Sequence, residues 1–91
     1  MPETARAKSN RVAQVTHQFS LIYSGTSELT EDLENALFEA GCADALLGVQ
    51  NGEVFLDFRR KAPSFQVALT SAVMDVERAG VGLELVRVEP A

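Results

Sequence analysis

Apolar and polar residues alternate along the first strand-like segment of the chain. Between Ala13 and Tyr23, Val15, Phe19 and Leu21 share one phase, and Thr16, Gln18 and Ser20 share the other. This period of two predicts a strand with one buried face. The small polar residues of the next stretch end it, as expected of a loop; they are Ser24, Gly25, Thr26 and Ser27.

The segment VQNGEVFLDF, residues 49–58, predicts a tight hairpin between Ala45–Gln50 and Glu53–Arg59. Asn-Gly between two apolar runs is typical of a two-residue turn, and such a turn fixes the pairing of the strands. Counting outward from it pairs Val49 with Val54 and Gly48 with Phe55. Phe55 then lies on the face opposite to Val54, beside Asp57, and we expect its ring to cover Gly48.

Two further segments have the spacing of amphipathic helices. In SELTEDLENALFEAG the apolar residues recur at three and four positions, Ser27 or Thr30 caps the start, and Gly41 ends the helix. The second helix follows Pro63-Ser64 and ends at Gly80. Its apolar stripe consists of Phe65, Leu69, Ala72, Val73 and Val76. A last strand is expected over Val81–Val88.

The order strand–helix–strand–strand–helix–strand predicts an α+β fold, the ferredoxin-like βαββαβ two-layer sandwich. It has a four-stranded antiparallel sheet with both helices on one face. We expect residues 1–12 to form a flexible tail and residues 13–91 a single domain. The face covered by the helices should be formed by Phe19, Leu21, Leu47, Val49, Val54, Leu56, Leu83 and Leu85. The uncovered face should present Thr16, Gln18, Ser20, Leu46, Gly48, Phe55, Asp57, Glu84 and Val86.

Charge narrows the choice of partners. The chain has 13 acidic and 8 basic residues; residues 1–12 hold one acid and three bases, which leaves 12 acids against 5 bases in the remainder. Residues 13–91 therefore carry a net negative charge, which repels phosphate backbones. We expect no nucleic-acid binding by this segment. The sequence contains no apolar run typical of a secretion signal or a membrane span, and it has a single cysteine. We therefore expect a cytoplasmic protein without membrane contact.

Candidate chemistry is sparse. Cys42 follows the end of a helix beside Glu39 and Asp44, which would raise its pKa, so a buried structural thiol is favoured. His17 is the only histidine and has no metal-binding or catalytic companion in the sequence. Asp44 and Asp57 should lie near each other as solvated carboxylates or as partners of Arg59. We expect no catalytic residues, no metal site and no cofactor.

Two alternatives come from domains that share this fold. The loop Ser24–Ser27 joins a strand to a helix, where small anions meet backbone N–H groups, and ACT-type effector-binding domains often use this loop. RNA-recognition domains place aromatic residues on the third strand, but here Asp57 stands where the second aromatic residue should be. We therefore keep the effector-binding loop as an alternative and reject RNA binding, although Arg59-Arg60-Lys61 forms a basic cluster.

The run from Phe19 to Pro90 resembles small uncharacterised bacterial proteins of actinobacterial type. The matching pieces are Ala36–Ala45, Asp57–Ser64, Asp75–Gly80 and Arg87–Pro90, which carry ALFEAGC, DF…APS, DVE-x-AG and RVEP. The chain departs at Arg60-Lys61, where the pattern has Arg-Glu. In longer members a helix-turn-helix segment follows RVEP, which implies an accessory domain of a DNA-binding regulator. Because the present sequence ends at Ala91 without that segment, DNA binding is not carried over.

These observations together favour a non-catalytic association module. The uncovered sheet face would pack against a second copy as a homodimer, the default symmetry, or against another protein. The residues expected at this interface are Phe55, Leu46, Gly48, Thr16, Gln18, Ser20, Asp57 and Val86.

Overall fold

A computed structural model describes residues 13–90, so the expected tail at residues 1–12 and the terminal Ala91 lie outside the described range. The elements are β2 (Val15–Ser24), α1 (Glu31–Ala40), β3 (Ala45–Gln50), β4 (Glu53–Ala62), α2 (Phe65–Ala79) and β5 (Glu84–Pro90). No helix within residues 13–90 is long and apolar enough to cross a membrane.

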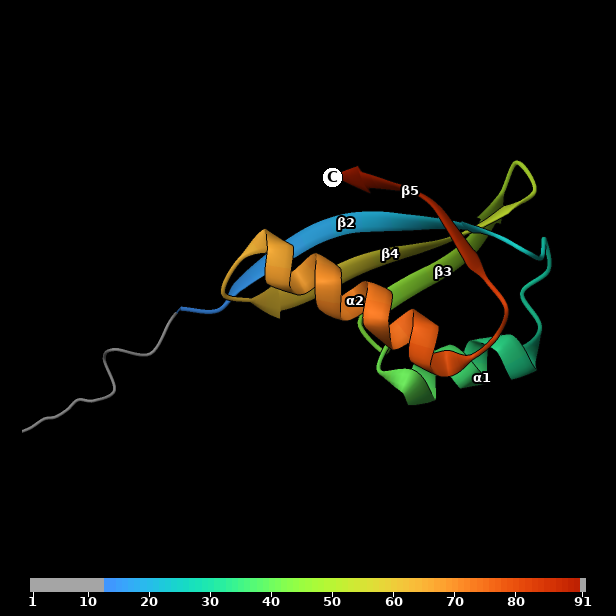
Figure 1. The fold of residues 1–91 in the computed structure, drawn as a ribbon, viewed down its shortest axis with the longest axis horizontal. Helices are drawn as coiled ribbons and strands as arrows, with labels where there is room; N and C mark the ends of the chain where they lie inside the picture. The colour runs from blue at the N-terminus through green and yellow to red at the C-terminus, as the bar shows by residue number, and fades with distance from the viewer. Residues whose placement is uncertain (1–12, 91) are drawn as a thin grey trace, which may run out of the picture.

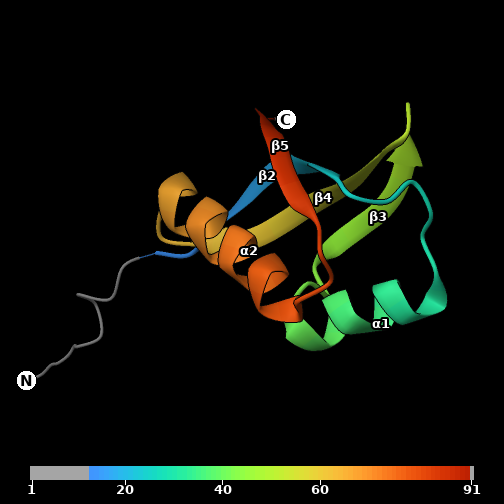
Figure 2. The same cartoon turned by 45° about the vertical axis from the view of Figure 1, so that its right-hand side comes forward.

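The strands form one antiparallel sheet in the order β3-β4-β2-β5, and both helices lie on the same side of it (Figures 1 and 2). Two strand–helix–strand units therefore interleave, with β2 and β4 in the centre. This is the ferredoxin-like two-layer sandwich that the order of predicted elements indicated. The opposite side of the sheet carries no helix (Figure 2).

The hairpin register is the one counted from the turn. Val49 pairs with Val54 and Gly48 with Phe55. Asn51 and Gly52 have φ values of 56° and 77°, the left-handed conformations that a two-residue turn of this type requires. The turn therefore fixes which residues of β3 and β4 face the helices.

Both helices begin and end at the expected kinds of residue. The Thr30 hydroxyl accepts a hydrogen bond from the N–H of Leu33, so Thr30, of the two predicted candidates, caps α1. The Ser64 hydroxyl caps α2 in the same way. Gly41 and Gly80 end the helices in the left-handed conformation.

The core lies between the sheet and the helices, around the stacked rings of Phe19 and Phe58, whose centroids are 5.4 Å apart. Two residues expected under the helices are instead exposed: Val49 by 41% and Leu85 by 42%. Both belong to edge strands, and Val49 lies beside the hairpin turn, which extends beyond the helices (Figure 1). The edge position, which the alternation does not reveal, explains both corrections.

Strand β5 differs from the prediction in its bounds and its phase. It runs from Glu84 to Pro90, and its register against β2 shifts between Ile22 and Tyr23. A β-bulge of this kind adds one residue to a strand and reverses the faces that follow. Arg87 consequently pairs with Ile22. Val86, expected on the uncovered face, falls within the bulge.

The two edges of the sheet are chemically different. Strand β5 carries the bulge, three charged residues and a terminal proline, all features that discourage pairing with another strand. Strand β3, with the sequence ALLGVQ, contains neither a charge nor a proline. Its outer edge is therefore the unprotected one.

Arg60 ties the helices to the sheet. It shares the helix-facing phase of β4, and its side chain is only 11% exposed. All five guanidinium N–H groups donate hydrogen bonds, and the acceptors are both carboxylate oxygens of Asp44, Oδ2 of Asp75, Oγ of Ser71 and the carbonyl oxygen of Gly41. The distances lie between 2.8 and 3.1 Å. Asp44, expected beside Asp57 or Arg59, is thus the partner of Arg60.

We predict that Arg60→Ala lowers the free energy of unfolding by about 3 kcal/mol, because it leaves Asp44 and Asp75 without their shared cation. The measurement is urea denaturation. Arg59→Ala, one position away on the exposed side of the same strand, is the control and should cost less than about 0.5 kcal/mol. Equal losses for the two variants would contradict the assigned role.

Candidate functional site

The open face is the side of the sheet that the helices leave uncovered. Its residues follow from the strand registers. They are Thr16, Gln18, Ser20, Ile22 and Ser24 of β2; Leu46, Gly48 and Gln50 of β3; Glu53, Phe55, Asp57, Arg59 and Lys61 of β4; and Glu84, Arg87 and Glu89 of β5, of which Glu84 was expected there. Every residue that the sequence placed on this face for β2, β3 and β4 is found there.

Phe55 occupies the middle of the open face and covers Gly48, as predicted. A Cβ atom added to Gly48 would overlap three carbon atoms of the Phe55 ring. The ring is therefore in close contact with the bare backbone of β3, the pairing that aromatic residues make with strand glycines. This contact fixes the position of the ring.

Ile22 completes this apolar centre and was missed by the sequence analysis. It lies between Phe55 on one side and Arg87 on the other, and only 6% of it is exposed although no helix covers it. The signal was present, because Leu21, Ile22 and Tyr23 are consecutive apolar residues and the middle one has to face away from the helices. Arg87 was missed because only the bulge in β5 brings it to this face.

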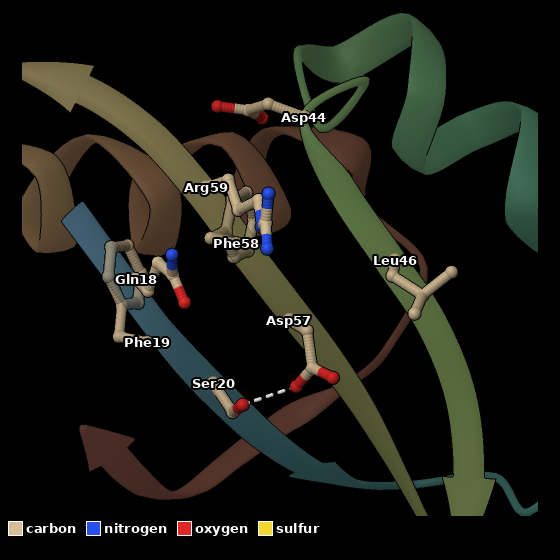
Figure 3. A pocket seen from close by; sticks show the side chains of 8 residues that line it. All are labelled: Gln18, Phe19, Ser20, Asp44, Leu46, Asp57, Phe58 and Arg59. Carbon is tan, nitrogen blue, oxygen red and sulfur yellow. Dashed lines mark hydrogen bonds between the residues drawn. The ribbon is translucent and has the colours of Figure 1, made fainter. Parts of the chain in front are cut away.

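A hollow of about 380 Å³ lies next to this centre (Figure 3). The side chains of Ser20 and Asp57 point toward each other from β2 and β4, and the Ser20 hydroxyl donates a hydrogen bond to Oδ1 of Asp57. Gln18 and Arg59 extend the polar wall, and Leu46 forms the opposite wall. Leu46 is 69% exposed because it stands on the edge strand rather than mid-sheet.

Charges on the open face are unevenly distributed along the strands. Arg59 and Lys61 occupy one end, beside the uncharged Gln18 and Thr16. Toward the other end, Arg87 of β5 forms ion pairs of 3.2 Å with Glu53 of β4 and 2.8 Å with Glu89 of its own strand. Hydrogen bonds to these two carboxylates raise the pKa of Arg87, so it stays charged at all ordinary pH values.

The loop of Ser24, Gly25, Thr26 and Ser27 makes one internal side-chain hydrogen bond and one close backbone contact. The Thr26 hydroxyl accepts a hydrogen bond from the N–H of Glu28. At Gly25, with φ of 119°, an added Cβ would lie 2.7 Å from the carbonyl oxygen of Gly82, so the loop packs closely against the segment before β5. Binding of an effector by this loop stays a prediction.

Cys42 is buried at 1% exposure, as the sequence indicated. Burial, followed by the nearby Asp75 carboxylate, raises the pKa of the thiol to about 11. Such a thiol carries almost no thiolate at neutral pH and is a poor nucleophile. Nε2 of His17 donates a hydrogen bond to the carbonyl oxygen of Ala62, 3.2 Å away, and the ring packs edge-on against Phe65. Among the described residues no group of three His, Cys, Asp or Glu side chains could hold a metal ion.

The Tyr23 hydroxyl is buried beside this thiol. It has no hydrogen-bond partner among the described residues. Burial, with smaller contributions from Cys42 and Glu77, raises the pKa of Tyr23 to about 12. Both groups therefore resist ionisation in the folded protein.

No family model, curated protein or solved structure matches this chain. The resemblance to small bacterial proteins, carried by segments such as Ala36–Ala45 and Arg87–Pro90, accordingly stays a prediction.

We predict that Gly48→Ala destabilises the protein by about 1–3 kcal/mol, because the added methyl group displaces the Phe55 ring. In a Phe55→Ala background the same change should cost nothing or stabilise by about 0.5 kcal/mol, since alanine is preferred to glycine within a strand. Urea denaturation of the four proteins completes the double-mutant cycle. An equal cost in both backgrounds would show that the ring does not depend on the glycine.

Stability should fall at alkaline pH. The ordinary pKa values are 9.0 for Cys42 and 10.0 for Tyr23, and folding raises them to about 11 and about 12. Between these limits the unfolded chain has lost protons that the folded chain retains, so the free energy of unfolding is at its full value below pH 9 and decreases as the pH rises above it.

Tyr23→Phe tests this dependence. It removes a buried hydroxyl without a partner, so stability at pH 7 should stay unchanged or rise by about 1 kcal/mol. The decrease above pH 10 should become smaller than in the wild type. Urea midpoints measured from pH 7 to 11 decide the matter, and an unchanged alkaline slope would refute the contribution of Tyr23.

Proposed function

We propose that this protein is a non-catalytic association module whose open face packs against a second copy of the chain. The observation that carries the proposal is the apolar centre of that face, where Phe55 covers Gly48 and flanks Ile22 in mid-sheet. Soluble domains expose such centres within a polar rim where they form interfaces.

The centre is well prepared for binding. Phe55 is held in place by its contact with Gly48, so little side-chain freedom is lost when a partner covers the ring. The ring is half-buried against β3, so what it offers a partner is its outer side, in the central position that interface anchors occupy. Leu46, with most of its side chain exposed, adds apolar surface at the margin.

The surrounding residues form a suitable rim. The Ser20 hydroxyl donates one hydrogen bond to Asp57, so covering this pair costs less than covering two free polar groups. Arg59, Lys61 and Glu89 stand further out, where ion pairs stay in contact with water. A module of this kind brings two copies of any attached segment together, the role implied by the resemblance to accessory domains of helix-turn-helix proteins.

We predict that Phe55→Glu yields a folded monomer, because a carboxylate at the centre of the interface would lose its hydration on association. The matched control is Phe38→Glu, which changes a 63% exposed phenylalanine on α1, away from the open face, and should leave association unchanged. Sedimentation equilibrium gives the mass, and circular dichroism confirms that both variants are folded. A wild type that is monomeric at high micromolar concentration would refute the proposal.

A further inference from the structure

The open-facing residues of β4 carry a directional charge pattern. In chain order they are Glu53, Phe55, Asp57, Arg59 and Lys61: two acids flank the phenylalanine at one end, and two bases follow at the other. The neighbouring strands add to the pattern. Residues that pair across neighbouring strands lie at the same level along the sheet. Glu89 and Asp57 both pair with Ser20 and share one level, and Arg87 and Phe55 both pair with Ile22 and share the next.

Two stacked copies related by a two-fold axis can meet in two ways. If the axis runs along the strands, each level of one sheet faces the same level of the other. Glu53 then meets the partner's Glu53, and Arg59 meets the partner's Arg59. If the axis runs across the strands, their direction is reversed and the basic end of each copy faces the acidic end of the other. Like charges in direct opposition destabilise an interface, so the two arrangements differ in energy.

We infer that the second copy packs with its strands reversed, with Arg59 of each copy facing the partner's Glu53; this inference rests on the proposed function. The axis passes between Phe55 and Asp57, at the midpoint of the six-residue step from Glu53 to Arg59, so the Phe55 ring of each copy lies opposite the partner's Asp57 beside the axis. These two residues are roughly 20 Å apart in the extended strand. Each copy contributes the same pair, so the contact occurs twice.

The same axis matches other charges. Arg87 and Glu89 lie one residue on either side of the axis. Arg87 of each copy therefore faces Glu89 of the partner's β5. An axis placed one residue further along, at Asp57, would instead bring Asp57 against the partner's Asp57. The charge pattern therefore selects the register as well as the direction.

The first experiment uses charge reversal. Arg59→Glu and Glu53→Arg should each weaken self-association about tenfold or more, because each places like charges opposite one another at both contacts. An equimolar mixture of the two variants should form a heterodimer of near wild-type affinity, since its contacts are again between opposite charges. Glu53→Arg also removes the ion pair between Arg87 and Glu53 within its own chain. Mixing does not restore that pair, so recovery on mixing reports the contact between the copies alone. Sedimentation velocity reads the dimer fraction, and a mixture no stronger than its components overturns the inference.

The second experiment measures geometry without altering these charges. A spin label attached at Thr16→Cys stands five residues from the axis, so reversed strands place the two labels roughly 30 Å apart. Strands in the same direction would place them roughly 10 Å apart, the spacing of packed sheets. The native Cys42 is buried and stays unlabelled.

The outcomes separate the two claims. A wild type that is monomeric overturns both the proposed function and the reversed arrangement. A dimer that is disrupted by Phe55→Glu but shows the short label distance overturns only the arrangement. The long distance together with recovery on mixing supports both.

Discussion

The alternation of side chains along β4 is the constraint on which the rest of the structure depends. Even-numbered positions from Val54 to Ala62 enter the core or bind the helices, and odd-numbered positions from Glu53 to Lys61 form the open face. The Asn51-Gly52 turn fixes this phase. A shift of one residue would place charges in the core and Leu56 and Phe58 in water. One strand thus determines both the packing of the protein and the chemistry of its uncovered side.

The features predicted correctly from the sequence are those that depend on nearby residues. The hairpin register follows from a two-residue turn, and the helix ends follow from Thr30, Ser64 and the two glycines that succeed the helices. The contact of Phe55 with Gly48 could also be predicted, because the register places the two residues opposite each other.

The remaining features depend on contacts between distant segments. Arg60 belongs to the helix-facing phase, but its acceptors come from two distant segments, the connection after α1 and the helix α2, which no local pattern brings together. The bulge in β5 is equally hidden, since Leu85, Val86 and Val88 allow either phase of alternation. Arg87 and Ile22 could therefore be assigned to the candidate site only from the pairing of β5 with β2.

The unequal edges of the sheet limit how far assembly can proceed. The bulge, charges and proline close the β5 side, so only β3 offers unpaired backbone groups to another strand. Continuous stacking into a fibril needs two receptive edges on every molecule, one to add to and one to be added to. Assembly through sheet edges alone therefore stops at the pair, because two copies that join by their β3 edges have no further edge to offer.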